Sequence, residues 1–232
     1  MPFEDEQYDN SGKICGQIIS EPILRKSALD RYYTNFLISV PTDNFDQPDI
    51  ISCVTWDQML AKAFTSHMRK GNYVKLEGYL HSSEYVNKYN QKCHSYQMTF
   101  DDYDPQATLT KENQFYLDGF FIGYPNKPKF VVNKDGQEQA IVNVSFRDIK
   151  RDSNDSMIMA VITKPSAIAQ LKQYDYFGHL TLSIIGTLHH QTQSPVKKQY
   201  WLNVDKYVKF DNSYYDPASE VGIDDGYDPY TD

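Results

Sequence analysis

The sequence predicts an all-β protein with one short helix in each of two repeated halves. Two observations lead to this fold class. Apolar and polar residues alternate in several stretches, such as the one carrying Phe36, Ile38 and Val40, which is typical of half-buried strands. The same order of glycines and apolar stretches returns about 103–108 residues further along the chain, so the halves are expected to share one fold.

The repeat is clearest in two places. Residues 16–22 and 119–125 both read Gly-x5-Pro after an apolar stretch. Residues 71–80 (GNYVKLEGYL) correspond to residues 178–188 (GHLTLSIIGTL), where the glycines and apolar residues recur with one extra residue between the glycines. The alternation in both pairs predicts strands of the same rank in each half.

A short helix is predicted between the third and fourth strands of each half. Residues 56–69 carry Met59, Leu60, Phe64 and Met68 at helical spacing, and Gly71 follows. In the second half Pro165 suits the first turn of a helix. Each half thus reads β-β-β-α-β-β over about 95 residues, the order of an OB-fold, a five-stranded barrel plugged by one helix.

These elements predict five segments. Two tandem OB-fold five-stranded β-barrels are joined by a linker, preceded by an acidic arm and followed by a disordered acidic tail without periodicity. The boundaries are 1–12 for the arm, 13–103 for the first barrel, 104–112 for the linker, 113–210 for the divergent second barrel and 211–232 for the tail.

The acidic net charge of −8 is concentrated at the two ends of the chain. Of the 31 acidic residues, seven follow Lys209 and four lie in residues 1–10, which leaves 20 acids against all 23 bases between them. The body is therefore weakly basic, and a basic body attracts phosphates whereas an acidic tail does not.

The composition also argues against several classes of protein. No run of about 18 apolar residues indicates a membrane span, and the polar start MPFEDEQYDN does not resemble a secretory signal, so a cytoplasmic protein without a membrane partner is expected. Three widely spaced cysteines predict neither disulfides nor a zinc site. No phosphate loop or nucleophile elbow is present, and His189 and His190 point to opposite faces of a strand, so we expect no enzyme, metal or cofactor.

The first half resembles the bacterial-type single-stranded DNA-binding protein family, in a tandem OB-fold arrangement. The resemblance begins with a Gly-x5-Pro-x-x-Arg motif that ends at Arg25. It continues over residues 49–80, where an apolar strand ends in Val-x-Trp and an amphipathic helix follows. It closes with the long hairpin at residues 81–97. The acidic tail resembles the family's C-terminal tip, except that Thr231 and Asp232 end it. The divergence and this tail suit a phage or plasmid protein.

Binding of single strands without sequence preference needs aromatic faces for the bases and basic groups along the backbone. The resemblance places stacking aromatics at Trp56, where the third strand ends, and at Tyr85 in the polar hairpin. Further aromatic candidates lie in the same hairpin, in the first loop and beside buried positions: Tyr89, Tyr32, Tyr33 and Tyr79. The basic candidates are Arg25, Lys26, Lys62, Lys75, Lys88 and Lys92.

In the second half the positions of Trp56 and Tyr85 are taken by Thr163 and by residues 191–193. Its available aromatics include Phe130 and Trp201, which are its candidates for DNA contact. The second half is expected either to bind DNA through other residues or to pack against other barrels.

These features predict sequence-independent binding and protection of single-stranded DNA in replication, recombination or repair, in the cytoplasm of a bacterium or a phage-infected host. The resemblance implies a homodimer with four barrels, and a tail that contacts replication or repair proteins. Two alternatives stay open, an OB-fold adaptor that mainly binds replication proteins and an OB-fold nuclease.

Overall fold

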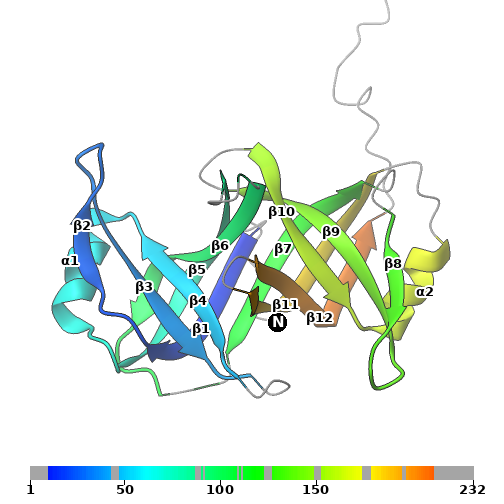
Figure 1. The fold of residues 1–232 in the computed structure, drawn as a ribbon, viewed down its shortest axis with the longest axis horizontal. Coiled ribbons are helices and arrows are strands. Elements are labelled where there is room, and N and C mark those ends of the chain that lie inside the picture. The colour runs from blue at the N-terminus through cyan, green and yellow to red at the C-terminus, as the bar shows by residue number, and fades with distance from the viewer. Residues whose placement is uncertain are drawn as a thin grey trace, which may run out of the picture.

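The computed structural model describes residues 10–42, 47–86, 90, 92–108, 110, 112–122, 127–148, 153–173, 179–194 and 197–211. The described chain is mostly strand, with one short helix in each half (Figure 1). The first half contains β1 (Asn10–Ile18), β2 (Ile23–Lys26), β3 (Tyr32–Val40), β4 (Asp49–Thr55), α1 (Gln58–His67), β5 (Tyr73–Val86) and β6 (Lys92–Asp104). The second half contains β7 (Asn113–Ile122), β8 (Lys129–Val132), β9 (Glu138–Asp148), β10 (Ser153–Ile162), α2 (Pro165–Gln173), β11 (His179–Ser194) and β12 (Lys197–Asp211).

The described strands form one twelve-stranded sheet, in which corresponding strands of the two halves occupy mirrored places. The order is β2-β3-β4-β6-β5-β1-β7-β11-β12-β10-β9-β8, so each strand of the first half has its counterpart at the mirrored place. In both halves the fourth and sixth strands pair in parallel and the fifth and sixth pair as a long hairpin. Figure 1 shows the halves side by side, with α1 and α2 at opposite ends of the molecule.

The two halves join through their first strands, which pair antiparallel from Asn10 opposite Leu117 to Ile14 opposite Asn113. Equivalent asparagines support this junction. The Asn10 amide donates to the carbonyl of Leu80 at 2.8 Å, and the Asn113 amide donates to the carbonyl of Leu188 at 2.9 Å. These buried amides therefore tie each first strand to the fifth strand of its own half.

The helix α1 begins and ends with local signals of the sequence. The carboxylate of Asp57 accepts a hydrogen bond from the backbone N–H of Leu60 at 2.7 Å, a side-chain N-cap. Ala61 and Phe64 are buried on its inner face. Gly71 follows in a turn with a φ of 96°, a conformation that a side chain disfavours.

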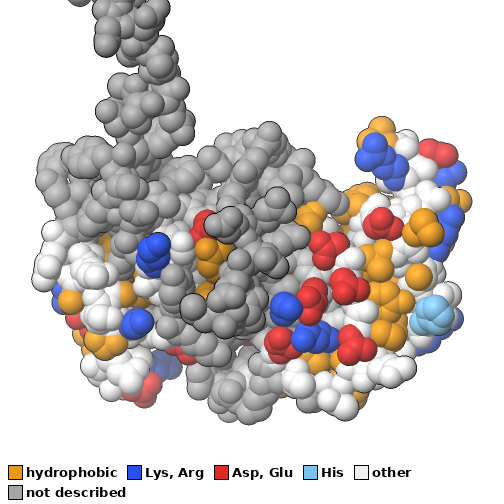
Figure 2. Space-filling view, turned by 180° about the vertical axis from the view of Figure 1, so that it is seen from behind, with side chains coloured by type: hydrophobic (Ala, Val, Ile, Leu, Met, Phe, Trp, Pro, Cys, Tyr) orange, Lys and Arg blue, Asp and Glu red, His pale blue; other side chains and the backbone are white. Residues whose placement is uncertain are grey.

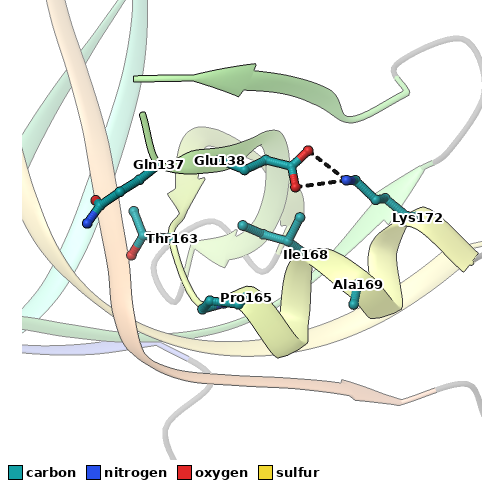
Figure 3. Close-up of a pocket in the computed structure, with 7 residues that line it drawn as sticks. All are labelled: Gln137, Glu138, Thr163, Pro165, Ile168, Ala169 and Lys172. Carbon is teal, nitrogen blue, oxygen red and sulfur yellow. Dashed lines mark hydrogen bonds and ion pairs between the residues drawn. The ribbon is translucent and has the colours of Figure 1, made fainter. Parts of the chain in front are cut away.

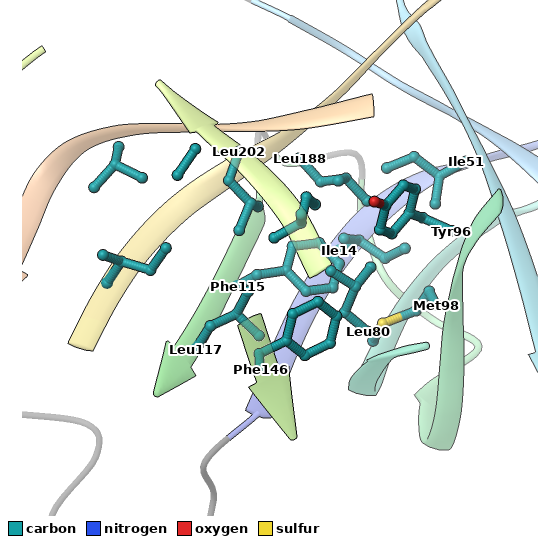
Figure 4. Close-up of a cluster of buried hydrophobic side chains, with 14 of the residues drawn as sticks. Ile14, Ile51, Leu80, Tyr96, Met98, Phe115, Leu117, Phe146, Leu188 and Leu202 are labelled. Carbon is teal, nitrogen blue, oxygen red and sulfur yellow. The ribbon is translucent and has the colours of Figure 1, made fainter. Parts of the chain in front are cut away.

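One buried apolar core runs through both halves and crosses the junction. Figure 4 shows Ile14 of β1, Phe115 of β7 and Phe146 of β9 lying together in it. A Cβ atom on Gly12 of β1 would lie 2.4 Å from the Phe115 ring, so only a glycine lets the ring approach this closely. The core therefore depends on matched residues from the two halves.

The structure corrects the expected strand count and the place of two tyrosines. In the described part of the chain each half has six strands rather than five, because β2 and β8, four residues each, pair with β3 and β9. Tyr32 and Tyr33 lie at the start of β3 and not in a loop. β1 begins at Asn10, within the stretch expected to be the arm, and residues 212–232 of the expected tail lie outside the described residues.

A second contact between the halves lies away from the junction of β1 and β7. The buried Asp49 carboxylate lies 2.8 Å from Nδ1 of His189. It also accepts a hydrogen bond from the backbone N–H of His190 at 2.8 Å. The phenol of Tyr96 donates to the carbonyl of Met157. These polar contacts fix the second half against β4 and β6 of the first.

Candidate nucleic-acid interface

The Trp56 cluster, defined here as Trp56, Tyr33, Tyr32, Lys26 and Lys62, lies where β3, β4 and α1 meet. Trp56 follows the last residue of β4, and 42% of its surface is exposed. Its ring stacks on Tyr33 with 4.5 Å between centroids and 23° between planes. The neighbouring ring therefore holds an exposed indole in a defined orientation, which suits a surface for stacking a base.

Two lysines flank the remaining tyrosine of the Trp56 cluster. Nζ of Lys62 on α1 lies 5.0 Å from the Tyr32 ring centroid, and Nζ of Lys26 on β2 lies 5.6 Å from it. Lys26 also pairs with the exposed Asp30 at 2.5 Å, so Lys62 rather than Lys26 is the phosphate candidate of the cluster. Arg25 stands opposite Tyr33 in the β2–β3 ladder and is exposed. Cations beside aromatic faces supply both requirements of single-strand binding.

The outer face of β3 and β4 leads away from the Trp56 cluster. On β3 the even-numbered positions from Thr34 onward are buried, whereas Tyr33, Asn35 and Leu37 point outward. Leu37 stands opposite Ser52 of β4, and Ser52 stands opposite Gln97 of β6. At about 3.3 Å per residue, Tyr33 and Leu37 are about 13 Å apart along the strand.

This face ends in a cleft of about 300 Å³ between the two halves, called the inter-half cleft below. The first half supplies eight of its lining residues and the second half supplies His190 and Tyr200. The described residues that line it are Leu37, Ile50, Ser52, Tyr85, His94, Ser95, Tyr96, Gln97, His190 and Tyr200.

The rings of the cleft pack on one another. The Tyr200 centroid lies 4.5 Å from that of His190 and 5.3 Å from that of Tyr96. Burial raises the pKa of Tyr96 to about 12, and burial followed by the nearby Tyr85 raises the pKa of Tyr200. Both phenols are therefore neutral at physiological pH. Tyr85, by contrast, is 42% exposed and lies near the turn of the long β5–β6 hairpin, opposite Cys93.

Two predicted contact residues lie elsewhere. Tyr79 is 7% exposed, so its ring belongs to the packed interior.

Lys75 pairs with Glu112 at 3.0 Å and with Glu77 at 3.7 Å. The hydrogen bond to Glu112 raises the pKa of Lys75. Figure 2 shows acidic and basic side chains gathered side by side on the rear face. An ammonium already held by two carboxylates is a poor phosphate contact.

The structure does not describe the side chains of three candidates in the hairpin. Lys88 and Tyr89 lie outside the described residues. Lys92 is the first residue of β6, but its side chain also lies outside the described part.

The second half has a different arrangement at the place of the Trp56 cluster. Thr163 follows β10 as Trp56 follows β4, and it lines a pocket of about 510 Å³ (Figure 3). There Glu138 pairs with Lys172 at 2.6 Å. Nζ of Lys172 lies 5.5 Å from the Phe130 ring. Trp201 is near His189 instead, 5.4 Å between centroids. The structure therefore does not bring Phe130 and Trp201 into one aromatic surface.

The described residues contain no group of three histidine, cysteine or acidic side chains that could hold a metal ion. Over the same part of the chain, no helix is long and apolar enough to cross a membrane.

Known proteins provide the remaining observation. Residues 9–106 match the single-strand binding protein family. This match confirms the resemblance that the sequence predicts for the first half, and it agrees with the expectation of a non-enzymatic protein. It ends before β7. No curated protein matches the chain.

Solved structures extend the likeness in fold to both halves. A crystal structure of a deletion mutant of the single-stranded DNA binding protein from Thermus aquaticus is 16% identical and has a TM-score of 0.65. The match covers 90% of this chain and 97% of that one. The wild-type Thermus aquaticus protein is 15% identical with a TM-score of 0.62, over 86% of this chain and 91% of that one. The all-β OB-fold architecture is thereby confirmed.

Proposed function

We propose that this protein binds single-stranded DNA without sequence preference and protects it during replication, recombination or repair. The observation that carries the proposal is the stack of Trp56 on Tyr33, exposed near Lys62 in the half that matches the family. An exposed indole offers its face to any base, because every base has a π-face. Bases in a duplex are already stacked, so the unpaired strand is favoured.

The mechanism follows from mass action. The cluster binds the strand only when its bases are free, so each binding event removes unpaired strand from the pairing equilibrium. Base stacking contributes about 1–3 kcal/mol per base, while Lys and Arg contacts to phosphates release counterions. The protein therefore opens hairpins without any chemical step.

The wider organisation is also part of the proposal. The chain is divided into two OB-fold barrels with boundaries near 13–103 and 113–210, supported by the mirrored strand order. Two chains form a homodimer with four barrels, and residues 211–232 contact replication or repair proteins. A phage or plasmid origin and a cytoplasmic location complete these predictions.

The test is direct binding of a labelled oligo-dT and of a matching duplex, followed by fluorescence anisotropy at low and high salt. The proposal predicts tight binding of the single strand, weak binding of the duplex and an affinity that falls as salt rises. Equal binding of both, or binding of neither, would leave the adaptor function as the better account. Light scattering gives the oligomeric state, and a monomer mass would rule out the dimer.

A further inference from the structure

The inter-half cleft joins aromatic and hydrogen-bonding groups from both halves. Tyr85 and Tyr96 come from the β5–β6 hairpin, whereas His190 of β11 and Tyr200 of β12 come from the other half. Ser52 and Gln97, which pair across β4 and β6, add polar groups. None of the described residues that line the cleft is Asp, Glu, Lys or Arg.

This lining fits a planar, neutral ring with polar edges. A volume of about 300 Å³ is at the small end of ligand pockets, so it accommodates a single ring system rather than an extended ligand. Aromatic walls stack on such a ring, and side-chain amides and hydroxyls bond its edge. None of the described lining residues carries a carboxylate that would repel a polyanion.

The cleft is continuous with the Trp56 cluster. The outward residues of β3 run from Tyr33 beside Trp56 to Leu37, which lines the cleft. A strand stacked on Trp56 and directed along the outward residues of β3 therefore reaches the cleft.

We propose that one base of the bound DNA strand enters the inter-half cleft and packs between Tyr85 of the first half and Tyr200 of the second. The second half then contributes to binding through β11 and β12, and not through the region of α2. This inference rests on the proposed function and deepens it, because it assigns a DNA-contact site to the half that the family match does not cover.

The region of α2 is less suited to a DNA strand. Glu138 and Lys172 are paired there at 2.6 Å, so the cation next to Phe130 is already neutralised. A carboxylate at this place repels phosphates. The place equivalent to Trp56 carries Thr163, which has no ring to offer.

The test compares the affinity of intact variants for labelled oligo-dT by fluorescence anisotropy. Tyr200→Ala is expected to weaken binding about tenfold, as for loss of one stacked base, while Tyr200→Phe keeps the ring and binds within about twofold of wild type. The matched control is Tyr116→Ala, a half-buried tyrosine on β7 that does not line the cleft. It is expected to bind as wild type.

A second readout uses the unaltered protein, so it does not depend on a variant that folds. Oligo-dT carrying 5-iodouracil is irradiated in the complex, and the crosslinked peptides are identified by mass spectrometry. Crosslinks at Tyr85 or Tyr200 support the inference. Crosslinks confined to the Trp56 cluster, together with normal binding by Tyr200→Ala, overturn it while the proposed function stands.

Two other outcomes are equally informative. If Phe130→Ala weakens binding about tenfold and Tyr200→Ala does not, the second half binds through the region of α2 and the inference is wrong. If the wild-type protein binds no oligo-dT at all, the proposed function fails, and the inference fails with it.

Discussion

Replacing Trp56 by alanine separates a stacking role from a packing role. The indole is 42% exposed and stacks on the Tyr33 ring at 4.5 Å. Loss of this pair and of the buried part of the indole is expected to lower the free energy of unfolding by about 2–3 kcal/mol, of which about 1 kcal/mol is the worth of the aromatic pair beyond its area. Loss of one stacked base is expected to cost about 1–3 kcal/mol of binding, roughly 5- to 150-fold in Kd.

The two quantities are measured independently on the same variant. Anisotropy of labelled oligo-dT gives the affinity without relying on tryptophan emission, and urea unfolding gives the stability. Met59→Ala is the matched control, because Met59 is 82% exposed on the adjacent helix and carries no ring. It is expected to change neither quantity by more than about 0.5 kcal/mol.

The opposite result is a Trp56→Ala variant that loses several kcal/mol of stability while its affinity for oligo-dT stays at the wild-type value. Trp56 would then be a packing residue that closes the barrel. A loss of affinity in Trp56→Ala that Trp56→Phe largely restores is the expected pattern, because phenylalanine keeps an aromatic face.

Three further predictions follow from the described contacts. Lys62→Ala is expected to reduce the salt slope of oligo-dT binding by about 0.7, the share of one phosphate contact, whereas Lys75→Ala leaves it unchanged; equal slopes for both variants would contradict the assignment. Asp49→Ala is expected to lower the free energy of unfolding by about 3 kcal/mol in urea, because it leaves the buried His189 without its carboxylate, and a loss below about 1 kcal/mol would argue against the inter-half contact. The pKa of Tyr96 is about 12 in the folded protein and about 10 when unfolded, so the unfolded state releases its proton first as pH rises. Wild type is therefore expected to lose about 2–3 kcal/mol of stability relative to Tyr96→Phe between pH 10 and pH 12, and parallel pH profiles would contradict the burial of the phenol.

The sequence predicted the elements that carry a strong local pattern. The helix α1 was predictable because apolar residues recur at helical spacing, and Trp56 because it ends an apolar strand just before that helix. The strands β2 and β8 were missed, since four mostly exposed residues show no useful alternation and are ordered only by pairing with β3 and β9.

The candidate site was less predictable because it depends on contacts between distant segments. His190 and Tyr200 reach Tyr85 only when the halves pack together, and no local spacing indicates that meeting. The strand pattern of β5 likewise does not reveal that Glu112, from the connection before β7, neutralises Lys75. Tyr79 was predicted to contact DNA from strand alternation alone, but its side chain is buried in the structure.

Intrinsic fluorescence reports whether single-stranded DNA stacks on the first half. The chain has two tryptophans, Trp56 in the first half and Trp201 in the second, so each signal can be assigned by substitution. Titration with oligo-dT is expected to quench emission strongly in the wild type and in Trp201→Phe, and weakly in Trp56→Phe. Quenching that persists in Trp56→Phe and disappears in Trp201→Phe would contradict the account.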